Sequence, residues 1–190
     1  MMLLYPYKNE VTIFISMHLT LLVSNCIILH INVFLRKQMQ RFGEHFMEFY
    51  TVCFFGHRYI SDIRIIDKRL TPIIKELIRT KSYVSFNIGR MGDFDEYAAS
   101  VIKSVQKLQG KENSELTLVL PYPITRIDDY KKYYDNIIIP ENICNTHPKR
   151  AIELKNRWMI EQADLIIVYV KENKGGAYSA MKYAERKKRK

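Results

Sequence analysis

Short apolar runs alternate along this chain with longer segments in which apolar residues recur every three or four positions. The runs are four to six residues long and carry no charge, as expected for strands buried on both faces of a sheet. They predict five strands, over residues 51–55, 83–88, 116–120, 136–139 and 165–170.

Helical periodicity occupies the segments between these strands. After a cap at Ser61 or Asp62, Pro72 interrupts the first helical pattern and predicts a kink, or a second helix capped by Thr71. Further helices are predicted from Asp93 to near Gly110, from Thr146 and Pro148 to near Gln162, and over 176–188. Strands separated by helices pair in parallel through right-handed crossovers. We therefore expect an α/β fold, a three-layer αβα, Rossmann-like, doubly wound and mainly parallel sheet of about five strands.

Residues 1–46 differ in character from the α/β domain predicted over 47–190. The run 11–35 carries no charge and is followed by basic residues, which suits an N-terminal transmembrane helix with a cytoplasmic domain behind it. Polar residues within the run weaken that interpretation. Two others stay open: an apolar helix packed on the domain, and a working protein that starts at Met39 or Met47.

Net charge and cysteine content narrow the function classes. The net charge is +10, but five of the positive charges lie in the basic tail Arg186–Lys190. Such a tail suits nucleic acid or an anionic membrane surface, although it is more often simply solvated. The three cysteines, Cys26, Cys53 and Cys144, have neither disulfide nor zinc-site spacing. We expect a cytoplasmic protein with no metal and no cofactor.

Three glycine-containing loops follow predicted strands: Gly56-His57-Arg58, the segment from Gly89 to Asp95, and the segment from Lys174 to Tyr178. In parallel sheets, ligands bind beyond the carboxyl ends of the strands. Glycines before a helix let a phosphate approach its unpaired N–H groups. One such loop is more often only a tight turn, but three at one edge predict a phosphate-bearing ligand.

Each candidate side chain has a functional and a structural interpretation. Arg58 is expected to clamp a phosphate or pair with a surface carboxylate, and His57 to contact the ligand or bond nearby backbone. Asp93 suits a helix cap, and Asp95 either helix stabilisation or a ribose hydroxyl. Tyr122 stacks on a base or packs at the rim. On the helix after Pro148, two arginines share a face with an acidic residue, which favours an ion-paired surface over a site (Arg150, Glu153 and Arg157).

The ordered motifs together resemble the SLOG superfamily, most closely its YspA/YpsA-like branch. They are Phe-Phe-Gly-His-Arg at 54–58, Gly-Arg-Met-Gly-Asp-Phe-Asp at 89–95, Leu-Val-Leu-Pro-Tyr at 118–122, Asn-Arg-Trp-Met at 156–159, and Ala-Asp-Leu at 163–165 leading to Lys-Gly-Gly-Ala-Tyr at 174–178. The resemblance covers residues 51–185. It implies a Rossmann-like domain that binds a nucleotide or nucleotide-derived ligand, with a pocket lined by Gly56, Arg58, Gly89, Gly92, Asp95, Gly175 and Gly176. The residues of the same motifs add five further candidate ligand contacts: His57, Arg90, Asp93, Tyr122 and Tyr178.

The same resemblance leaves enzymatic activity open. The LOG phosphoribohydrolases of the superfamily carry a catalytic glutamate after Gly-Gly-x-Gly-Thr, and this chain has Lys182 at that position. Glu185 and Asp95 are the candidate carboxylates instead. The leading hypothesis is a nucleotide-binding or sensing module. The alternatives are a nucleoside-monophosphate phosphoribohydrolase or deoxyribosyltransferase, and a DNA-binding accessory protein of the Smf/DprA type that uses the basic tail. Association with a second copy of the chain is also open.

Overall fold

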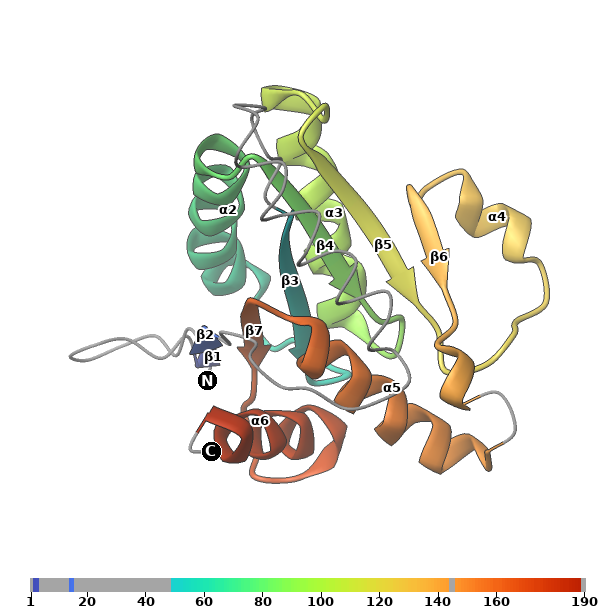
Figure 1. Ribbon diagram of the computed structural model, residues 1–190. Helices are drawn as coiled ribbons and strands as arrows, with labels where there is room; N and C mark the ends of the chain where they lie inside the picture. The colour runs from blue at the N-terminus through green and yellow to red at the C-terminus, as the bar shows by residue number, and fades with distance from the viewer. Residues whose placement is uncertain (1, 4–13, 16–48, 144–145, 189–190) are drawn as a thin grey trace, which may run out of the picture.

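A computed structural model describes residues 2–3, 14–15, 49–143 and 146–188, and its core is a parallel sheet of five strands. The strands are β3 (Phe49–Gly56), β4 (Tyr83–Ile88), β5 (Ser114–Val119), β6 (Asn136–Ile138) and β7 (Leu165–Tyr169). They lie in the order β7-β3-β4-β5-β6 (Figure 1). The predicted α/β, Rossmann-like class is confirmed, and all five predicted strands are present with ends that differ by at most two residues.

Two short strands near the N-terminus, β1 (Met2–Leu3) and β2 (Phe14–Ile15), pair antiparallel with β7. The remaining residues of 1–48 lie outside the described part of the chain. The predictions made for residues 1–46, namely a membrane anchor, a packed apolar helix or a later start of the protein, fall on those residues. In the part of the chain that the structure describes, no helix combines the length and the apolar character needed to cross a membrane.

Helices follow the strands as the periodicity predicts. They are α2 (Ile63–Thr80), α3 (Asp93–Gln109), α4 (Ile127–Lys131), α5 (Pro148–Gln162) and α6 (Gly175–Lys188), with a short 3₁₀ turn over Glu141–Ile143. The Asp62 side chain caps α2 by accepting from the Arg64 N–H, as expected. Gly110 ends α3 with a positive φ of 92°, a conformation that favours glycine.

Three local predictions about helix ends were wrong. The second-helix alternative at Thr71 fails, because α2 runs through Pro72, which lies on the exposed side. Gly92, not Asp93, is the N-cap of α3, and the Asp93 carboxylate instead accepts from the Ile60 N–H in the loop after β3. The helix predicted from Thr146 begins only at Pro148, because the Thr146 hydroxyl donates to the Ile143 carbonyl and His147 takes the cap position.

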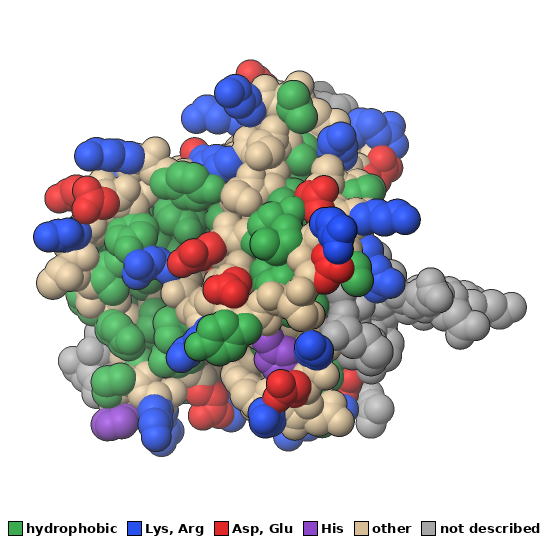
Figure 2. All heavy atoms as spheres, turned by 180° about the vertical axis from the view of Figure 1, so that it is seen from behind, with side chains coloured by type: hydrophobic (Ala, Val, Ile, Leu, Met, Phe, Trp, Pro, Cys, Tyr) green, Lys and Arg blue, Asp and Glu red, His purple; other side chains and the backbone are tan. Residues whose placement is uncertain are grey.

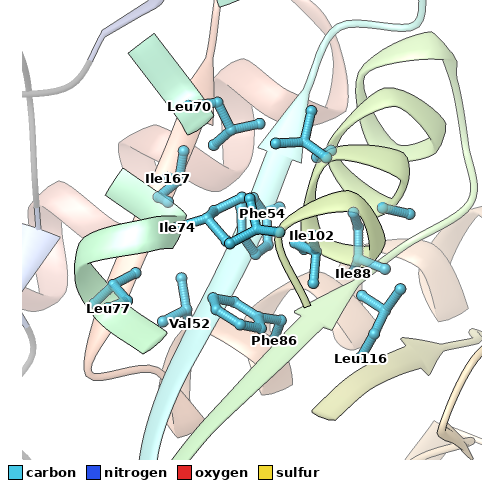
Figure 3. Packing of buried hydrophobic residues seen from close by; sticks show 14 of the residues in the cluster. Val52, Phe54, Leu70, Ile74, Leu77, Phe86, Ile88, Ile102, Leu116 and Ile167 are labelled. Carbon is cyan, nitrogen blue, oxygen red and sulfur yellow. The ribbon is translucent and has the colours of Figure 1, made fainter. Parts of the chain in front are cut away.

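Two hydrophobic layers cover the two faces of the sheet. On one face, alternate residues of β3, β4, β5 and β7 pack against α2 and α3, as Figure 3 shows for Val52, Phe54, Phe86 and Leu116 facing Leu70, Ile74 and Ile102. On the other face, Cys53, Phe55, Ile166 and Val168 pack against α5 and α6. Cys53 is fully buried, as expected for a small core residue.

The strand order places the topological switch point between β3 and β7. The chain moves from β3 to β6 in one direction, then returns through α5 to β7 on the other side of β3. Consequently α2, which follows β3, and α6, which follows β7, lie on opposite faces of the sheet. In such sheets the crevice beyond the carboxyl ends of the two switch-point strands is the usual ligand site.

Candidate functional site

The loops after β3 and β7 are joined at the switch point by His57. Its backbone N–H donates to the Tyr169 carbonyl at 3.1 Å, and its Nε2 accepts from the Glu172 N–H at 2.9 Å. Both bonds are made to backbone, so the structural interpretation of His57 is the one that the geometry supports. His57 therefore fixes the distance between the two loops.

The loops after β3 and β4 are packed backbone against backbone. A Cβ on Gly92 would lie 2.4 Å from the Arg58 Cα. The Asp93 N–H donates to the Arg58 carbonyl at 2.8 Å, and the Asp93 carboxylate accepts from the Ile60 N–H at 3.3 Å. The Arg58 side chain is exposed, and no described residue provides a hydrogen bond or ion pair for its guanidinium. Arg58 thus remains a candidate for a ligand anion.

Gly56 is required by the core rather than by a ligand. A Cβ at this position would lie 2.1 to 2.4 Å from three atoms of Phe94, a fully buried residue of the first turn of α3. The Phe94 ring is stacked on Tyr169 of β7, with 5.5 Å between centroids. The absence of a side chain at Gly56 therefore allows the start of α3 to pack closely against the ends of β3 and β7.

The N-terminus of α3 is filled by one of its own side chains. Asp95, which is only 8% exposed, accepts the Met91 N–H at 2.9 Å with Oδ2. A carboxylate thus occupies the position that the glycine loop was expected to offer to a phosphate. The first turn also carries Asp93 and Glu96, which repel a second anion. Glu96, Asp93 and Asp95 together disfavour phosphate binding at Gly89 and Gly92.

Beneath Gly89 lies a buried lysine that the sequence analysis did not single out. Lys155 of α5 is 3% exposed, and its Nζ and the Asp95 Oδ2 are each 2.9 Å from the position that a Gly89 Cβ would take. The two charged groups therefore come from helices on opposite faces and interact electrostatically around the end of β4, without a direct hydrogen bond or ion pair. Burial lowers the pKa of Lys155 and raises that of Asp95, while the opposite charge of each partner counteracts both shifts.

The sequence does contain a signal for this lysine. Ala151, Lys155 and Met159 are spaced four residues apart and form the buried stripe of α5. A lysine on such a stripe needs compensation, because an isolated buried charge is costly. Asp95, which supplies it, is distant in the sequence and was expected to stabilise the start of a helix or to accept a ribose hydroxyl.

The N-terminus of α6 is open, in contrast to that of α3. Gly175 has a positive φ of 87°, and a Cβ on Gly175 or Gly176 would meet no atom within 4 Å. Both glycines are exposed, and the first turn of α6 contains no acidic residue. The unpaired N–H groups of a helix start and its dipole favour an anion here.

From this helix end, a groove of about 560 Å³ extends between α5 and α6. We call it the α5–α6 groove. Its walls include Lys149, Ile152, Glu153, Asn156, Arg157 and Ile160 of α5, and Gly176, Tyr178, Ser179, Lys182, Tyr183 and Arg186 of α6. Four of these wall residues are basic (Lys149, Arg157, Lys182 and Arg186), and one, Glu153, is acidic. The face over α2 and α3, by contrast, mixes basic, acidic and apolar side chains (Figure 2).

Two expected ligand contacts lie away from the groove. Arg90 is exposed and stacks on Tyr130 of α4, with 4.4 Å from its guanidinium carbon to the ring centroid. Tyr122 lies beyond β5 and is 37% exposed, which is compatible with rim packing. Of the predicted residues, the structure brings Gly176 and Tyr178 together in one cavity and leaves Gly56, Gly89 and Gly92 in internal packing.

The candidate carboxylate Glu185 is paired within its own helix. It accepts from Lys182 at 2.9 Å and is not part of the groove wall. On α5, Arg157 pairs with Glu153 at 2.5 Å, and both side chains are exposed, as the ion-paired interpretation predicted. Arg157 nevertheless also lines the groove.

The comparisons with known proteins give no match: no family model, no curated protein and no solved structure is similar to this chain at a significant level.

Proposed function

We propose that this protein binds a nucleotide or a related phosphate-bearing ligand, with the phosphate at the N-terminus of α6 and the rest of the ligand in the α5–α6 groove. The observation that carries the proposal is the open helix end, where two exposed glycines meet a groove lined by cations and tyrosines. The resemblance to the SLOG superfamily points to the same ligand class.

The residues of the groove suit the two parts of a nucleotide. Gly175 and Gly176 allow close approach of a phosphate to backbone N–H groups, and Lys149 and Arg186 add positive charge along the walls. Tyr178 presents an aromatic ring near the helix end, and rings of this kind stack on any nucleobase. A groove of about 560 Å³ falls in the ordinary range for small-ligand sites.

Replacing Gly176 with aspartate should weaken phosphate recognition without destabilising the fold. The position is exposed and spacious, so the side chain fits. Its carboxylate would occupy the helix end as Asp95 does in α3, repelling an anion while interacting favourably with the helix dipole. We expect at least a tenfold loss of affinity for a nucleoside 5′-monophosphate, measured by calorimetry on the full chain, with an unchanged or higher melting temperature.

Gly176→Asn is the matched control, because it has the same size without the charge. It should keep most of the affinity. Adenosine, which lacks the phosphate, should bind at least ten times more weakly than AMP. The proposal fails if none of the four nucleoside monophosphates binds the wild-type chain, or if Gly176→Asp binds them as well as Gly176→Asn.

A further inference from the structure

The walls of the α5–α6 groove contain two aromatic–cation units in series. Tyr178 lies under Lys182, with 5.6 Å from Nζ to the ring centroid, and Tyr183 lies under Arg157, with 5.2 Å from the guanidinium carbon to the centroid. All four residues line the same cavity. The two tyrosines are five residues apart on α6, which corresponds to about 7.5 Å along the helix axis.

The groove is also longer than the helix end that anchors it. On α6 its wall runs from Gly176 to Arg186, which corresponds to about 15 Å along the axis. A single nucleotide bound by its phosphate at Gly176 would place its base near the first tyrosine. Tyr183 and Arg157, which lies over its ring, would then stay unused, as would Arg186 at the far end of the groove.

We propose that the ligand of this groove is a linear dinucleotide with a 5′-phosphate, a proposal that rests on the proposed function and makes it more specific. The terminal phosphate lies at Gly175–Gly176, the first base stacks on Tyr178 and the second on Tyr183. Stacking of the second base displaces the Arg157 side chain from the Tyr183 ring, and Arg157 exchanges its ion pair with Glu153 for the phosphate that links the two nucleosides. Aromatic stacking is tolerant of base identity, so the groove selects ligand length more than sequence.

Tyr183 allows a matched pair of variants. Its hydroxyl donates to Glu161 at 2.6 Å, so Tyr183→Phe removes that bond but keeps the ring, whereas Tyr183→Leu removes the ring. Calorimetry on the full chain compares AMP with the 5′-phosphorylated dinucleotide pApA for the wild type and both variants. UMP with pUpU forms a second pair.

Wild-type protein should bind pApA about 5- to 150-fold more tightly than AMP, the gain expected for one additional stacked base. Tyr183→Leu should bring the ratio of the pApA affinity to the AMP affinity close to one, and Tyr183→Phe should keep the wild-type ratio. AMP binding with no gain for pApA and pUpU would overturn the dinucleotide proposal and leave the proposed function standing. A gain that survives in Tyr183→Leu would overturn it as well. Absence of binding by all four probes would overturn both.

Discussion

Replacing Lys155 with methionine is expected to lower the free energy of unfolding by about 2–4 kcal/mol, because it leaves the Asp95 carboxylate buried without its compensating charge. Methionine matches the aliphatic stem of lysine, so the loss reflects charge rather than volume. Asp95→Asn should lower the free energy of unfolding by a similar amount, because it leaves the Lys155 ammonium buried without an opposite charge. The asparagine amide oxygen can still accept the Met91 N–H. Urea denaturation followed by circular dichroism measures both.

The double variant Lys155→Met/Asp95→Asn separates charge compensation from packing. With both charges removed and the cap at Met91 retained, stability should return to within about 1 kcal/mol of the wild type. Additive losses in the double variant, or a Lys155→Met protein as stable as the wild type, would show that the two groups do not compensate each other.

Gly56→Ala is expected to destabilise the protein by about 3 kcal/mol, near the upper end of the range for overpacking a core. The added methyl group would overlap three atoms of Phe94. That ring has no room to move away, because it is fully buried and stacked on Tyr169. Thermal or urea unfolding measures the loss. Gly176→Ala serves as the matched control and should change stability by less than about 0.5 kcal/mol, since its Cβ would meet open space.

A compensating substitution tests whether Phe94 is the cause. Phe94→Leu shortens the side chain opposite Gly56 and is destabilising by itself, because it removes buried ring atoms. In the double variant Gly56→Ala/Phe94→Leu, the loss should be smaller than the sum of the two single losses by at least about 1 kcal/mol. Strictly additive losses would mean that Gly56 is needed for another reason.

The fold class could be predicted from the sequence because burial leaves a periodic trace. A strand covered on both faces must be apolar at successive positions, as in Leu165–Tyr169, and a helix covering it must be apolar every three or four residues. Both patterns are local, so they placed the five parallel strands, the helices and the edge at which the glycine loops lie. The short helix α4 was missed, since its five residues have no buried position to create a pattern.

Only the tertiary structure decided which glycine loop is open. The three loops look alike in the sequence, yet the Cβ positions of Gly56, Gly89 and Gly92 meet Phe94, the Asp95–Lys155 pair and the Arg58 backbone, while those of Gly175 and Gly176 meet nothing. The side chains and backbone beside Gly56, Gly89 and Gly92 come mostly from segments that are distant in the sequence. The local periodicity of the chain does not indicate which distant segments come into contact. The sequence by itself determined the sheet edge at which the glycine loops gather, and predicted a phosphate-bearing ligand there. The packing of α3 and α5 around the end of β4 closed one part of that edge, and α6 kept the other part open.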